Sequence, residues 1–288
     1  MAGSFYHIWA ARQVWVDRFP GQPAQGPDWS AFVAGTLAPD LGFFPGGPAR
    51  FSQRLHHESS GDFIRALQAQ AQGSSERAFA AGWALHIYLD VALHPWVNNW
   101  VDHRPNVAVG TTKAVRDMWH MRLEWGIDCH LLQQQEGAFL WTVEPYFPPR
   151  QGEHDLLAKV GQDFFATDAA PPLLDRGAAS TRRWVRLLPR IFTALGHTRP
   201  HRCNWPLRSW TAAARPLLGP FFGRLLEGGR GSPSSASVAW PWRPDQVQLR
   251  EGLQLGQQAL KAYRAGWQEA FAGLANLDLD TGLETGRQ

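Results

Sequence analysis

The chain has few cysteines, few lysines and no long apolar run. Only Cys129 and Cys203 are present, too few for a disulfide framework or a thiolate zinc cluster. No apolar stretch approaches the roughly 18 residues that span a bilayer, and the N-terminal residues lack the basic and apolar segments of a secretory signal. We therefore expect a cytoplasmic protein without a transmembrane segment. Any bound metal must be held by histidine and carboxylate side chains.

Several common catalytic motifs are also missing. The sequence contains no Walker loop, no dinucleotide-binding fingerprint and no Gly-x-Ser-x-Gly elbow. These absences argue against the common nucleotide-binding enzymes and against serine hydrolases.

Apolar residues recur at three- and four-residue intervals along most of the chain, and no series of strands is visible. The pattern predicts helices over residues 29–37, 61–71, 75–101, 111–135, 155–165, 178–195, 208–226 and 243–272. We expect an all-α, multi-helical bundle in which residues 1–288 form one domain. Its metal-binding half is expected at about 1–135 and an Arg- and Trp-rich half at about 150–288, with a Gly- and Ser-rich loop at 228–240.

Positive charge is concentrated in the second half. Between Arg176 and Arg230 the chain carries eleven arginines and a single acid, Glu227, interleaved with tryptophan and phenylalanine. Such a segment suits an anionic membrane surface, or less favourably a nucleic acid. Because 25 of the 28 basic residues are arginine, an ordinary solvated helix face is the simpler alternative.

Two triplets of potential metal ligands have helical spacing. Residues four apart on a helix lie one above another, so each triplet presents a row of polar groups. The triplets stand in apolar sequence, where unpaired burial would cost several kcal/mol. Zinc would offset that cost, and a buried hydrogen-bond network is the alternative. Asp128 either orients an imidazole from behind or is a helix-surface acid. The triplets are His86, Asp90 and His94, and His120, Glu124 and Asp128.

Further candidates lie earlier in the chain and after His94. Asp40 follows a proline in an expected loop, where it is either a site carboxylate or a turn residue. His56 and His57 adjoin a helix start, and only one of them can face inward. His7 lies in an expected first helix. Pro95 is expected to end or bend the helix after His94, so that His94 can share a metal with the second triplet.

This ordered set of residues resembles the zinc-dependent phospholipase C family over roughly residues 5–135. The resemblance implies an all-α fold related to the single-strand-specific zinc nucleases, with one to three zinc ions in one cleft. Secreted members also bind zinc through an N-terminal Trp, which this chain lacks. The matched positions are His7, Asp40, His56, His86, Asp90, His94, His120 and Glu124.

The resemblance also implies a role for each matched residue. One zinc would be held by His56, His86 and Asp90, with His56 preferred over His57 because the local sequence is similar to a bacterial branch of the family. Asp90 would bridge to a second zinc on His7. A third would be held by the matched residues His94, His120 and Glu124, and the Asp40 position serves as ligand or general base.

The implied activity is that of a zinc-dependent, phospholipase C-like phosphoester hydrolase. The water activated by the metal would have a pKa of about 7 and would attack phosphorus in line. Asp40 would orient or deprotonate this water. Two alternatives stay open: a nuclease or nucleotide phosphohydrolase on the same cleft, and a non-catalytic metal-binding helical protein. The expected partner is a phospholipid or another phosphoester substrate.

Overall fold

The computed structural model describes residues 3–18, 24–103, 113–134, 140, 151–194, 244–268, 271 and 273–285. Within these ranges the elements are helical, which confirms the all-α prediction, and the pairing closest to a strand is an isolated bridge between Leu277 and Glu284. No described helix has the length and apolar character needed to cross a membrane. The elements are α1 (Ser4–Arg18), α2 (Pro27–Leu37), η1 (Ala38–Gly42), α3 (Ala49–His57), α4 (Ser60–Gln70), α5 (Ser74–Asp102), α6 (Lys113–Gln133), α7 (Gln151–Phe165), η3 (Ala166–Ala169), α8 (Pro171–Ala194) and α10 (Gln246–Gln268).

The predicted helices that fall on described residues are present, with shifted bounds. α8 begins seven residues before the prediction, because Pro171 and Pro172 are acceptable in the first turn of a helix. The prediction missed α3, whose nine residues bury only four side chains. The predicted helix 208–226 and the predicted loop 228–240 lie outside the described residues.

Helix α5 continues through Pro95 to Asp102, in agreement with the helix predicted over 75–101, so of the two expected effects of Pro95 the ending of the helix does not occur. Proline has no N–H to donate to the preceding turn. The last turns of α5 are instead stabilised by packing, since Val97 and Val101 form a small apolar cluster with Trp119 and Leu123 of α6. His94 therefore stays on the same helix as His86 and Asp90.

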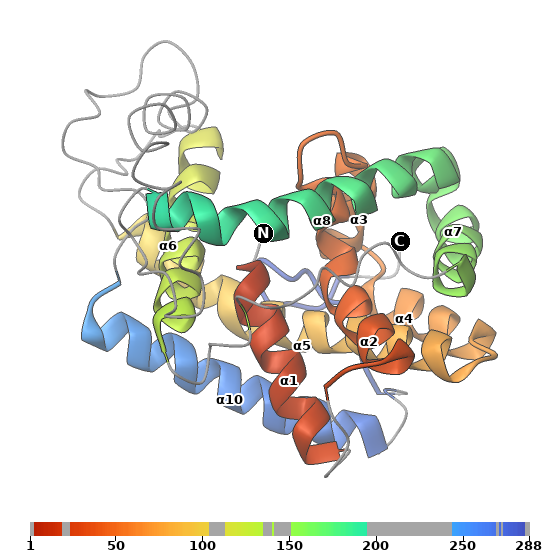
Figure 1. The fold of residues 1–288 in the computed structure, drawn as a ribbon, viewed down its shortest axis with the longest axis horizontal. Coiled ribbons are helices and arrows are strands. Elements are labelled where there is room, and N and C mark those ends of the chain that lie inside the picture. The colour runs from red at the N-terminus through yellow and green to blue at the C-terminus, as the bar shows by residue number, and fades with distance from the viewer. Residues whose placement is uncertain are drawn as a thin grey trace.

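The long helix α5 is covered by α2 on one side and by α10 on another (Figure 1). In α10, Leu260 and Tyr263 are buried, and the Tyr263 hydroxyl donates to the carbonyl of Ala81 at 3.0 Å. The last predicted helix thus packs back on the first half of the chain. This contact favours a single domain, although the division of the whole chain stays a prediction.

Helices α2 and α5 cross at two glycines. A Cβ at Gly35 would overlap the carbonyl oxygen of Phe79, and a Cβ at Gly82 would overlap that of Phe32. Close backbone approach of this kind requires glycine. The crossing brings the carbonyl of Thr36 to 3.0 Å from Nδ1 of His86, so it also positions a site residue.

We expect Gly82→Ala to lower the free energy of unfolding by about 1–3 kcal/mol, because the added methyl group overpacks the crossing. The measurement is chemical denaturation followed by circular dichroism. Gly152→Ala is the matched control. Gly152 also lies in a helix, where alanine has a higher helix propensity than glycine, and a Cβ added there would meet only the flexible side chain of Glu76. Equal stability of the two variants would contradict the tight crossing.

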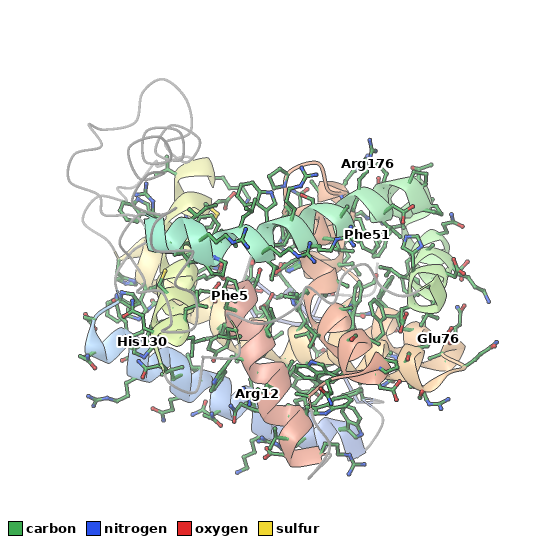
Figure 2. The ribbon with its side chains drawn as sticks, viewed as in Figure 1. Phe5, Arg12, Phe51, Glu76, His130 and Arg176 are labelled. Atoms are coloured by element: carbon green, nitrogen blue, oxygen red, sulfur yellow. The ribbon has the colours of Figure 1, made fainter. Side chains whose placement is uncertain are left out.

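Helix α8 lies on the same side of the molecule as η1 and α3 (Figure 1). Its inner face is held by Ser180, whose hydroxyl donates to the carbonyl of Pro45 at 2.7 Å. The outer face carries exposed arginines, of which Arg176 projects away from the body in Figure 2. The exposed arginines of α8 are Arg176, Arg183, Arg186 and Arg190.

Candidate metal centre

Polar side chains from five elements converge beside the middle of α5. They come from α1, η1, α3, α5 and α6, and all of them are buried except His120, whose side chain is 12% exposed. Sequence analysis predicted every member of this set. The residues are His7, Asp40, His56, His86, Asp90, His94, His120 and Glu124.

The first group consists of Asp40, His56, His86 and Asp90, whose potential ligand atoms all lie within 4.8 Å of one another. Nε2 of His86 lies 2.9 Å from Oδ2 of Asp90, and Nε2 of His56 lies 3.3 Å from Oδ1 of Asp40. Asp40 is in the short helix η1, not in a loop. A hydrogen bond of 2.8 Å from the Gly42 amide to the Ser52 hydroxyl ties η1 to α3 and so brings Asp40 next to His56.

The second group consists of His94, His120 and Glu124, again with potential ligand atoms within 4.8 Å. Nε2 of His120 lies 2.8 Å from Oε1 of Glu124, and Nε2 of His94 lies 3.4 Å from the same oxygen. This group could hold one metal ion.

Asp90, a member of the first group, also contacts the second group and α1. Its Oδ2 is 3.4 Å from Nε2 of His94, and its Oδ1 is 3.1 Å from Nε2 of His7. The rings of His7 and His86 stack with their centroids 4.4 Å apart. Asp90 thus contacts His7 and members of both groups, and it is the candidate for a bridging carboxylate.

Four imidazole rings are oriented by contacts of their Nδ1 atoms, on the side of the ring away from the cluster. Each Nδ1 faces an acceptor and donates to it, which leaves Nε2 directed into the cluster as the potential metal ligand. The four pairs are His56 with the Ser52 carbonyl at 2.8 Å, His86 with the Thr36 carbonyl at 3.0 Å, His120 with Oδ1 of Asn98 at 2.8 Å, and His94 with Oδ1 of Asp280 at 3.0 Å.

Several atoms of the cluster are buried without a well-formed hydrogen bond to any described residue. They include Nε2 of His7 and of His94 and both carboxylate oxygens of Asp40 and Asp90. Buried carboxylate oxygens and imidazole nitrogens that lack well-formed hydrogen bonds are costly unless a proton or a metal ion lies between them. Imidazole nitrogen and carboxylate oxygen are ordinary zinc ligands. The residues present therefore fit zinc.

The electrostatics of the site follow from this arrangement. Burial lowers the pKa of His94, but the neighbouring Asp90, Asp280 and Glu124 raise it more, to about 10. In the same way, burial lowers the pKa of His56 and its contacts with Asp40 and Asp90 bring it to about 9. The metal-free cluster therefore binds protons tightly, and zinc must displace them.

His57 and Asp128 lie outside the cluster. The side chain of His57 is 42% exposed and lies 3.2 Å from Asp278, so His56 is the inward-facing member of the pair. Asp128 is fully buried, and the surface alternative for it is wrong. It accepts hydrogen bonds from the backbone amides of Phe5 at 3.3 Å and Tyr6 at 2.9 Å.

Asp128 thereby satisfies backbone groups at the first turn of α1 (Figure 2 labels Phe5 there). The first amides of a helix have no partner within the helix, so an acceptor at this position stabilises its start. Because His7 follows directly on this turn, Asp128 orients the helix that carries His7, not an imidazole ring.

Sequence analysis missed two residues that contact the site, Asn98 and Asp280. Asn98 follows His94 by four residues, so its helical spacing was a usable signal. Asp280 is 186 residues away from His94, and no local pattern indicates such a contact.

Comparison with known proteins agrees with this geometry. The family model described as zinc dependent phospholipase C matches residues 6–165. The chain belongs to the zinc-dependent phospholipase C family. No curated protein and no solved structure gives a match. Zinc is the cofactor of this family, and membership together with the two buried groups supports a zinc-dependent phosphoester hydrolase.

Proposed function

We propose that the protein is a phospholipase C-like hydrolase that cleaves the phosphodiester of a phospholipid. The oxygen of a water molecule forms a bond to phosphorus while the bond between phosphorus and the glycerol oxygen breaks. The glycerol oxygen takes up a proton, and the products are diacylglycerol and a phosphorylated headgroup. The convergence of buried Nε2 and carboxylate atoms on one cluster, several of them without a well-formed hydrogen bond, carries this proposal.

The side chains of the cluster have distinct roles in the proposal. One to three zinc ions would be held by the two groups. His7, which contacts Asp90, would contribute a further ligand beside the first group. When bound, zinc lowers the pKa of water and stabilises negative charge on phosphate oxygens. Asp40 is the proposed general base, because its oxygens have no well-formed hydrogen bond and lie beside His56 and His86.

The basic face of α8 favours a lipid surface as the place of action. Its four exposed arginines follow one side of the helix, and their charge would be attracted to anionic headgroups. The location of the protein in the cell stays a prediction.

A nuclease or nucleotide phosphohydrolase is the alternative function. For this activity, the aromatic residues interleaved with the arginines would stack on bases. Those aromatic residues lie mostly in 195–243, outside the described residues.

The test is product analysis with the full chain reconstituted with zinc. Vesicles of phosphatidylcholine, with and without anionic phosphatidylserine, are compared with single-stranded DNA and RNA, and products are identified by mass spectrometry. We expect diacylglycerol, faster release from anionic vesicles, loss of activity with a chelator and recovery when zinc is restored.

Other outcomes would identify the alternatives. Release of mononucleotides without diacylglycerol would replace the phospholipase with a nuclease. Tightly bound zinc without turnover of any substrate would favour a non-catalytic metal protein. A version with Arg183 and Arg186 both changed to glutamine would separate surface attraction from chemistry, because it should lose only the preference for anionic vesicles.

A further inference from the structure

The C-terminal segment, residues 273–285, is fixed across α3 and α4. The amide of Leu279 donates to the carbonyl of His56 at 2.7 Å, and the amide of Leu277 donates to the hydroxyl of Ser60 at 2.8 Å. The amide of Asp62 donates to Oδ1 of Asn276 at 2.8 Å. The segment lies outside residues 6–165, which the family model matches, yet it contacts the backbone of a residue of the first group.

A turn in this segment presents Asp280 to α5. Oδ1 of Asp278 accepts hydrogen bonds from the amides of Asp280 at 2.9 Å and Thr281 at 3.0 Å. Gly282 completes the turn with a φ of +70°, which favours glycine, and its amide donates to the Asp278 carbonyl at 2.8 Å. The position of the Asp280 backbone is therefore set by this turn.

Asp280 reaches both imidazoles of the second group. Its Oδ1 accepts a hydrogen bond from Nδ1 of His94 at 3.0 Å. Its backbone carbonyl accepts one from Nδ2 of Asn98 at 3.0 Å, and Oδ1 of Asn98 in turn accepts one from Nδ1 of His120 at 2.8 Å. One residue thus fixes the ring of His94 directly and the ring of His120 through Asn98.

The partner of His94 differs in kind from those of His56 and His86. The latter two donate to neutral backbone carbonyls, whereas Asp280 offers a carboxylate. A charge-assisted hydrogen bond is roughly twice as strong as a neutral one, and a carboxylate behind an imidazole makes the opposite nitrogen a better metal ligand. The contact is on the Nδ1 side of the ring, away from the Nε2 atom that faces Glu124 at 3.4 Å.

We infer that Asp280 is a positioning residue of the second metal group, which orients His94 directly and His120 through Asn98 and strengthens His94 as a ligand. The inference rests on the proposed zinc binding. It extends the metal centre to the C-terminal segment, which supplies an outer carboxylate and no ligand.

The experiment compares Asp280→Asn with the matched variant Asp278→Asn in the full chain. Both changes remove one carboxylate from the same segment. The amide oxygen at position 278 can still accept the two turn hydrogen bonds, and Asp278 contacts only the exposed His57 among the histidines. Zinc affinity is measured by competition with a chromophoric chelator, and the ligand field by the visible spectrum of the Co²⁺-substituted proteins.

We expect Asp280→Asn to weaken one zinc site by about 10- to 100-fold and to shift the Co²⁺ absorption bands. Asp278→Asn should leave both readouts unchanged, and the metal-free forms of both variants should keep the helical circular dichroism spectrum of the wild type. These results would separate positioning from general packing.

Two results would overturn the inference. Wild-type affinity and spectrum in Asp280→Asn would show that the carboxylate does not act on the metal group. Equal losses in both variants, with a weaker helical circular dichroism spectrum of the metal-free forms, would assign the effect to folding of the segment. If the wild type itself binds no zinc, the proposed function fails first, and the measurement identifies that case separately.

Discussion

Asp90→Ala is expected to remove most of the bound zinc and to reduce phosphodiester hydrolysis by about three orders of magnitude or more. Asp90 belongs to the first group and also contacts the second group and α1: its oxygens lie 2.9 Å from His86, 3.4 Å from His94 and 3.1 Å from His7. Its loss leaves several imidazoles without the anionic partner that balances the charge of a cation. Zinc content per chain is measured by inductively coupled plasma mass spectrometry on untagged protein purified without chelator.

The control for this change is Asp117→Ala, which removes an exposed aspartate from α6, another helix that carries site residues, where it pairs with Lys113. It should keep the zinc content and activity of the wild type. A wild type that takes up no zinc, even after zinc is offered during dialysis, would contradict the metal centre. The histidines and carboxylates would then form a buried hydrogen-bond network, which is the alternative that the sequence also allowed.

The ligand rows were predictable because they depend on helical spacing alone. Each four-residue step turns about 40° around a helix, so His86 and His94 point about 80° apart, with Asp90 between them. That divergence explains why His86 belongs to the first group and His94 to the second. The sequence analysis had assigned His94 to the second group from the resemblance and from the expected effect of Pro95, not from this angle.

The same geometry explains where prediction from spacing failed. Asp128 continues the row of His120 and Glu124, but by its position the helix has turned about 80° from His120, and the carboxylate faces the start of α1 instead. Asp280 depends on a contact across 186 residues, for which a single sequence carries no periodic signal. Helix-local features of the site were thus accessible, and features set by packing between distant segments were not.

The choice of His56 over His57 depended on resemblance and not on spacing. Adjacent residues on a helix point about 100° apart, so only one could face the cluster, but the sequence did not say which. The structure supplies the reason: Nδ1 of His56 is held by the Ser52 carbonyl one turn earlier, whereas His57 faces the C-terminal segment. The side that α3 buries is fixed by Phe51 and Leu55, which belong to the main core.

Asp40→Asn is expected to reduce hydrolysis by about 10²- to 10⁴-fold, the usual contribution of a general base, while most of the zinc is retained. Asparagine has nearly the same size but cannot take a proton from water. Burial raises the pKa of Asp40, but His86 and His56 lower it more, to about 2, so the carboxylate is ionised at neutral pH. His56, His86 and Asp90 remain to hold an ion in the variant. Zinc content and turnover are measured on the same preparation. If Asp40→Asn loses as much zinc as Asp90→Ala, Asp40 is an essential ligand and the assignment as base is wrong; full activity would exclude both roles.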